Sequence, residues 1–74
     1  MKIAVQTPLK NNEIRLLLDG AEKDGVYFSF EEKKGISLVF EAEGANASAA
    51  CGIAKKMIKD TDWGKVLYFS VQEL

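Results

Sequence analysis

The sequence contains no histidine, and its 74 residues include one cysteine and one proline. The chain therefore lacks the commonest general base and the commonest metal ligand. Its single cysteine, Cys51, can form neither an internal disulfide nor a CxxC metal site, and it suggests a reducing compartment. No acid–base, nucleophile or metal constellation is recognisable. The sequence therefore predicts a protein that is not an enzyme and carries no cofactor.

Charge of one sign and long apolar runs are also missing. Ten basic residues oppose eleven acidic ones, for a net charge of -1, which gives no general attraction to nucleic acid or to an anionic membrane. No stretch approaches the roughly 20 apolar residues of a membrane-spanning helix, and the apolar run near the N-terminus is too short for a signal peptide. We expect a soluble cytoplasmic protein with no membrane among its partners.

What the sequence does have is enough apolar material for one core. Apolar residues make up 47% of the chain, which is ample for a folded domain. The length corresponds to a single domain over residues 1–74. A core this small is marginal unless it is well packed or extended across a partner.

The N-terminal third contains one clear strand and one ambiguous segment. Residues 2–7 alternate as a strand does, and Pro8 ends it. Residues 13–24 form a helix on one interpretation, with Asn12 as its cap and Gly25 just past its end. On the other interpretation the segment is a strand. Helix-forming residue types and the end signals favour the helix, whose inner face would carry Ile14, Leu17, Leu18 and Ala21.

The middle of the chain predicts a β-hairpin. Residues 26–31 and 36–43 both alternate apolar and polar side chains, and the turn between them, residues 32–35, ends in Gly35. Its inward-facing side chains would be Val26, Phe28, Phe30, Ile36, Leu38 and Phe40.

The C-terminal half contains the clearest helix and a last strand. Asn46 caps a helix that runs to about Asp60. Cys51 lies on its inner face and is expected to act as a small core residue. Residues 65–71 predict the final strand. The inner face of the helix would carry Ala47, Ala50, Cys51, Ala54 and Ile58.

The predicted fold is an α+β two-layer sandwich, with an antiparallel sheet and both helices on one face. Its element order, βαββαβ, is that of a ferredoxin-like sandwich. If residues 13–24 are a strand, the alternative is a five-stranded antiparallel meander with one helix, ββββαβ.

Four side chains would then decorate the uncovered face of the sheet, and they are the main functional candidates. An apolar and aromatic patch of this kind is typical of a protein interface. Aromatic side chains on an open sheet face also stack bases in single-stranded RNA binders, but the consensus of those proteins is missing. We therefore favour a small protein-binding or regulatory module, acting through this face as a homodimer or with a protein partner, over nucleic-acid binding. The candidate interface residues are Tyr27, Val39, Val66 and Tyr68.

A second hypothesis places a small-molecule ligand at the turn before the last helix. A glycine turn that opens a helix can present backbone N–H groups to an anion. Gly44, Asn46 and Ser48 are the candidate residues of this turn. The protein would then be a small-ligand sensor whose site forms at a dimer interface near Gly44 to Asn46.

Overall fold

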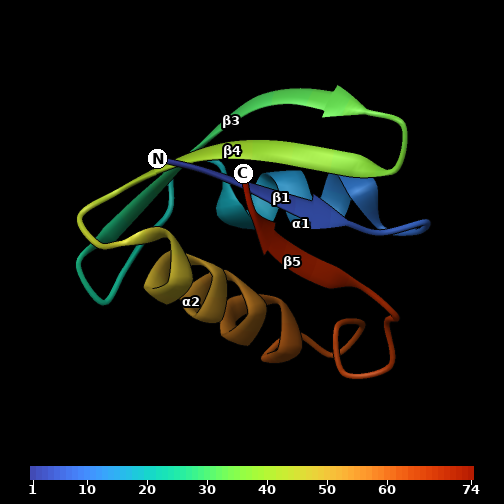
Figure 1. Ribbon diagram of the computed structural model, residues 1–74. Helices are drawn as coiled ribbons and strands as arrows, with labels where there is room; N and C mark the ends of the chain where they lie inside the picture. Colours follow the sequence, from blue (N-terminus) through green and yellow to red (C-terminus); the bar gives the residue numbers. More distant parts are fainter.

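Five antiparallel strands form one curled sheet in the computed structural model, which describes residues 1–74 (Figure 1). Two helices pack against the same face of this sheet, because both contribute side chains to one buried cluster. Along the chain the elements are β1 (Lys2–Gln6), α1 (Asn11–Leu18), β2 (Glu22–Lys23), β3 (Val26–Lys34), β4 (Ser37–Glu43), α2 (Ala47–Lys59) and β5 (Ser70–Glu73).

The strands lie in the order β2-β3-β4-β1-β5, and every neighbouring pair is antiparallel. The small α+β class predicted from the sequence is confirmed. The element order, βαβββαβ, is not strictly the predicted βαββαβ, because β2 is an additional short strand at the sheet edge.

The ambiguous segment is a helix at its start and a strand at its end. The helix prediction holds for α1, so the meander with one helix is wrong. The predicted extension to residue 24 is also wrong, because Asp24 and Gly25 both have positive φ, 52° and 83°, and form a tight turn between β2 and β3. Asp-Gly is a preferred pair for two-residue hairpin turns, so Gly25 closes a hairpin here and does not end a helix.

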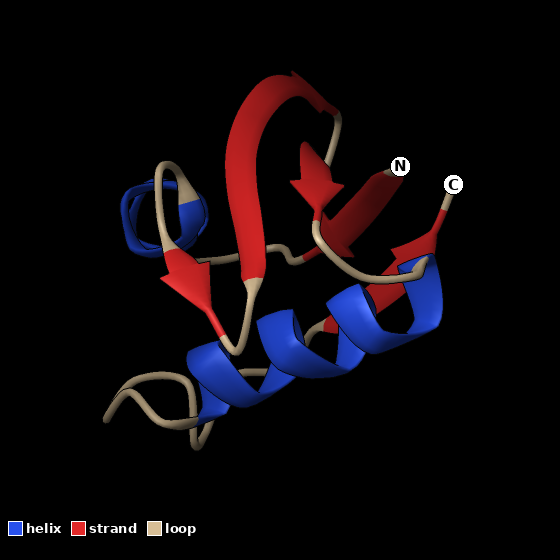
Figure 2. Cartoon of the chain, turned by 90° about the vertical axis from the view of Figure 1, so that its left-hand side faces the viewer, coloured by secondary structure: helices blue, strands red, loops and turns tan.

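The predicted hairpin is present as β3 and β4, but its turn is shorter than expected. Strand β3 continues to Lys34, and only Gly35 and Ile36 connect the two strands. A β-bulge between Phe30 and Glu32 shifts the pairing by one residue, and β3 is strongly bent in Figure 2. The prediction that Ile36 faces inward is wrong, because this turn side chain is 55% exposed.

Helix α2 agrees with the prediction at both ends. The Asn46 side chain accepts a hydrogen bond of 2.8 Å from the backbone N–H of Ala49, as an N-cap should. The predicted inner face is correct in its centre, where Ala50, Ala54 and Ile58 are fully buried. Cys51 is only half-buried, and α2 packs along β5 and β1.

The last strand is much shorter than predicted. Residues 65–69 lie outside any strand, and β5 begins only at Ser70. The Thr61 hydroxyl donates to the carbonyl of Ile58 at 2.7 Å and accepts from the N–H of Gly64 at 2.8 Å. This cap holds the chain in a turn beyond α2. The apolar residues Leu67 and Phe69 then pack against the core and do not pair as a strand.

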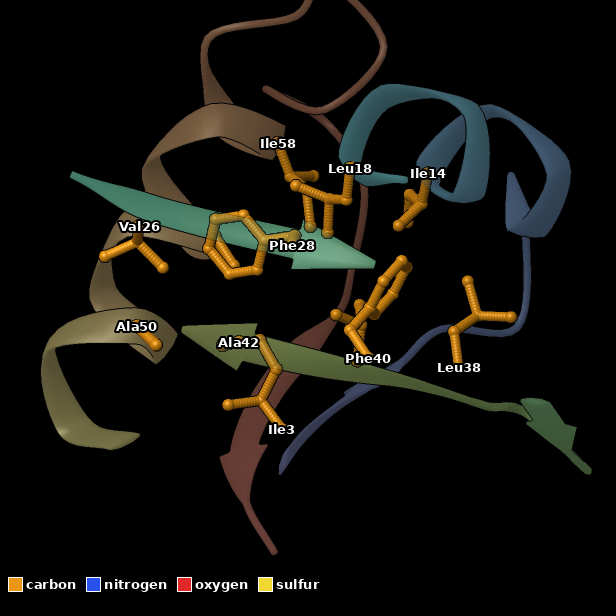
Figure 3. Packing of buried hydrophobic residues seen from close by; sticks show 12 residues of the cluster. Ile3, Ile14, Leu18, Val26, Phe28, Leu38, Phe40, Ala42, Ala50 and Ile58 are labelled. Atoms are coloured by element: carbon orange, nitrogen blue, oxygen red, sulfur yellow. The ribbon is translucent and has the colours of Figure 1, made fainter. Parts of the chain in front are cut away.

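Figure 3 shows the core, in which side chains from the two helices meet those of the central strands. Phe28 and Phe40 are its largest fully buried side chains. The Phe40 ring packs edge-on against Phe30, with ring centres 5.6 Å apart. The cluster consists of Ile3, Val5, Ile14, Leu18, Val26, Phe28, Leu38, Phe40, Ala42, Ala50, Ala54 and Ile58.

Candidate functional site

The four candidate interface residues lie in two different settings. Tyr27 on β3 and Val39 on β4 belong to the sheet, and their register places both on the face away from the helices. Val66 and Tyr68 lie in the loop before β5 and are 88% and 90% exposed. The prediction that Val66 and Tyr68 belong to a strand is therefore wrong, and neither projects from the sheet as Tyr27 does.

The register also separates the two tyrosines. Tyr27 pairs with Glu43 at one end of β4, whereas Tyr68 lies by Gln6, which pairs with Ser37 at the other end. Six residues of strand span about 20 Å, since a strand rises roughly 3.3 Å per residue. The two aromatic rings thus belong to opposite ends of the sheet.

Polar side chains surround the middle of the open face. Val39 is 5% exposed, and its strand partner Ala4 is also buried. Around them, Lys2 pairs with Glu31 at 2.9 Å, and this carboxylate raises the pKa of Lys2. On the β5 side, the Gln6 amide oxygen lies 3.4 Å from both the Ser70 hydroxyl and the Gln72 amide nitrogen. The exposed apolar surface therefore lies toward the ends of this face.

Exposed apolar side chains border a pocket at the Tyr68 end of the sheet, here called the terminal pocket. It has a volume of about 340 Å³. The Thr7 N–H donates to the Ile36 carbonyl at 2.9 Å, which joins the ends of β1 and β4 next to this pocket. Its lining residues are Gln6, Pro8, Ile36, Tyr68, Phe69 and Ser70.

Sequence alternation missed Pro8 and Ile36 as parts of a surface. Both lie in connections, where period-two arguments do not apply, and they come together because β1 and β4 pair in register. Pro8 was predicted to end a strand, whereas Ile36 was predicted to lie inside the next strand and not in the turn. Turn residues at the same end of neighbouring strands are the one signal that could have indicated this pocket.

The open edge of β5 lies beside the terminal pocket. Leu74 donates its N–H to the Lys2 carbonyl at 3.0 Å, and this bond shows which residues of β5 direct their backbone groups toward β1. In an antiparallel pair every second residue exchanges such bonds, so Gln72 and Ser70 also direct their N–H and carbonyl groups toward β1. The N–H and carbonyl groups of Val71 and Glu73 therefore point away from β1. No strand of the sheet lies on that side.

The turn before α2 has a local structural explanation. Gly44 has a φ of 107°, and a Cβ there would overlap the carbonyl oxygen of Gly25. Gly44 therefore allows two turns to touch. Asn46 uses its side-chain oxygen to cap α2, and Ser48 is exposed in the first helical turn.

Cys51 lies on α2 toward β5. Burial raises the pKa of its thiol, and the nearby carboxylate of Glu73 raises it further. A thiol with a raised pKa is a poorer nucleophile at neutral pH, because less of it is present as thiolate. This environment supports the assignment of Cys51 to packing.

Neither helix has the length and apolar character that crossing a membrane requires. No cluster of three or more cysteine, aspartate or glutamate side chains is arranged to hold a metal ion. No family model, curated protein or solved structure matches this chain.

Proposed function

We propose that the protein is a small non-enzymatic protein-binding module that captures its partner at the terminal pocket. The observation that carries this proposal is the gathering of exposed apolar side chains around a hollow. Tyr68 is 90% exposed and Ile36 is 55% exposed, and both line the same pocket. Exposed apolar groups gathered around a concavity are typical of interaction sites.

The occupant we propose is an extended segment of a protein partner. The backbone groups of Val71 and Glu73 are free to pair with an added strand, and the pocket beside Ser70 can take an apolar side chain of that strand. Strand addition gives affinity through main-chain hydrogen bonds, and pockets for alternate side chains give specificity. Tyrosine suits the rim because its ring buries a large area while its hydroxyl stays in water.

The test is a selection of peptides from a random library against the wild-type protein, followed by affinity measurements on variants. We expect peptides with apolar residues at every second position. The double variant Ile36→Ser and Tyr68→Ser should bind them at least about tenfold more weakly, because an anchor residue at an interface contributes about 2 kcal/mol or more. The matched control is Tyr27→Ser, which removes an exposed tyrosine at the far end of the sheet and should leave affinity unchanged.

A second pair of variants tests the β5 edge. Glu73→Pro removes an N–H that points away from β1, so the fold should remain while the added strand loses a donor. Glu73→Ala is its control, because it removes the same side chain and keeps the N–H. If neither the pocket pair nor Glu73→Pro weakens the selected peptides, the proposal fails. If sedimentation shows that the wild type forms a dimer that the pocket variants break, the occupant is a second copy and not a foreign segment.

We also propose that the architecture is a ferredoxin-like sandwich with an added edge strand. The support is the order β3-β4-β1-β5, which remains when β2 is set aside. This architecture hosts many unrelated functions, so it contributes nothing to the choice of partner.

A further inference from the structure

A second hollow lies between the start of α1 and the distal half of the β3–β4 hairpin, and we call it the cationic cleft. Its volume is about 300 Å³, within reach of a small ligand. Its walls come from two segments that are about twenty residues apart in the sequence. The lining residues are Asn11, Asn12, Arg15, Phe30, Lys33 and Leu38.

The charge of this cleft is of one sign. Arg15 and Lys33 line it, and no carboxylate does. Neither cation forms an ion pair within the chain. The two carboxylates nearest to Lys33 in sequence are engaged elsewhere, because Glu31 pairs with Lys2 at 2.9 Å and Glu32 pairs with Lys34 at 3.6 Å. Two cations without counter-charges therefore face one small concavity.

The bottom of the cleft is apolar and held in place. The Phe30 ring lies edge-on against the buried Phe40, which fixes its orientation. The guanidinium of Arg15 lies over the Phe30 ring, 5.5 Å from its centre. Leu38 is almost fully buried and completes the apolar surface. A ligand held here would meet the apolar carbon of Phe30 next to the Arg15 guanidinium.

Two hydrogen bonds that involve lining residues hold the walls of the cleft in place. The Asn11 side chain donates to the Thr7 carbonyl at 3.0 Å, which ties the start of α1 to the end of β1. At the other end of the helix, an Asp19 side-chain oxygen accepts the N–H of Phe30 at 3.0 Å. The helix and the strand are therefore joined beside the cleft, and Asp19 is occupied by a backbone donor.

We propose that the cationic cleft binds a small organic anion, whose carboxylate or phosphate group meets Arg15 and Lys33 and whose apolar body rests on Phe30. Arginine can engage either group through two parallel hydrogen bonds, and lysine adds a mobile point charge. The Asn12 side-chain amide, which also lines the cleft, supplies a neutral donor. This site is separate from the terminal pocket and does not depend on the protein-binding proposal, since the two hollows share no lining residue.

The experiment follows backbone amide signals of the isotope-labelled protein while phenyl phosphate is added. We expect saturable shifts confined to the amides of residues 11–15 and 30–38. Benzoate, inorganic phosphate and uncharged benzyl alcohol are titrated in parallel. Stronger binding of phenyl phosphate than of benzoate would assign phosphate as the preferred group, and the reverse order would assign carboxylate. Added salt should weaken either anion, because exposed charges are screened.

Variants distinguish binding of the anion in this cleft from its general attraction to positive charges on the protein. Arg15→Gln and Lys33→Gln should each weaken the better anion by about tenfold, the loss expected for one charge-assisted hydrogen bond. Lys65→Gln is the matched control, because it removes one positive charge from the loop before β5 and should change nothing. Both cleft side chains are exposed, so the fold should survive their replacement.

Three results would overturn the proposal. The first is the absence of saturable shifts in the cleft with both aryl anions. The second is equal binding of benzyl alcohol, which would remove the role of charge. The third is an equal loss of affinity in the Lys65→Gln variant, which would mean that the anion responds to net charge and not to this cleft.

Discussion

Replacing Phe40 with alanine should remove a large part of the stability of this domain. Phe40 is fully buried at the centre of the core and packs edge-on against Phe30 at 5.6 Å between ring centres. It also pairs with Ile3 across the central strands. Its ring belongs to the cluster that both helices and the sheet build, so truncation would leave a cavity in the core.

The magnitude follows from the size of the chain. Burial of a phenylalanine ring of this kind is worth roughly 3–5 kcal/mol when the ring is truncated to alanine. A domain of 74 residues has a free energy of unfolding of about 4–11 kcal/mol in total. The entropy of unfolding at this length is about 0.16 kcal/mol per degree, so the melting temperature should fall by about 20–30 °C.

Thermal and denaturant unfolding, followed by circular dichroism, measure this change. Leu16→Ala is the control, because Leu16 lies on α1 with 75% of its surface exposed and should change the free energy of unfolding by less than about 0.5 kcal/mol. A Phe40→Ala variant that melts within a few degrees of the wild type would refute the inward orientation of β4. A Leu16→Ala variant that loses as much stability as Phe40→Ala would instead contradict the exposed position of Leu16 on α1.

Three further predictions concern single positions. Gly64→Ala should strongly lower the free energy of unfolding in urea, because a Cβ at this position would overlap a backbone carbonyl of the last turn of α2. In Gly52→Ala the added Cβ meets nothing within 4 Å, so this variant should be as stable as the wild type or more stable. Asn46→Ala should lower the free energy of unfolding by about 1 kcal/mol through loss of its cap, again measured in urea, and an unchanged midpoint would contradict the cap. Cys51 should react with thiol reagents more slowly than a free cysteine at neutral pH, and its reaction should become faster as the pH rises through its raised pKa. The Glu73→Gln variant should react faster than the wild type, and rapid labelling of the folded wild type would contradict the shielded thiol.

The parts of the fold that the sequence predicted correctly are those with two independent local signals. Helix α2 has both a capping asparagine and a periodic inner face, and both its ends were predicted to within about one residue. The β3–β4 hairpin has alternation on both sides of a glycine turn. In each case, local backbone preference and burial of apolar surface favour the same structure, so neither has to yield to the other.

The parts that were missed are those where one residue type serves two kinds of structure. Gly25 suits the end of a helix and the second position of a hairpin turn, and only the pairing of β2 with β3 decides between them. The apolar alternation of residues 65–69 is that of a strand, but the Thr61 cap turns the chain first. Burial of Leu67 and Phe69 against the core then satisfies the same apolar pattern without strand pairing.

The cationic cleft depends on the same kind of non-local choice, made at the bulge in β3. In a regular strand Glu32 would have followed Phe30 onto the helix-facing side of the sheet, and Lys33 would have pointed to the open face. The extra residue reverses this order, so that Lys33 pairs with Leu38 on the helix side and Glu32 pairs with Val39 on the open side. Without the bulge a carboxylate would face Arg15 and neutralise the cleft. One inserted residue therefore makes this cleft positively charged, and hence suited to an anion.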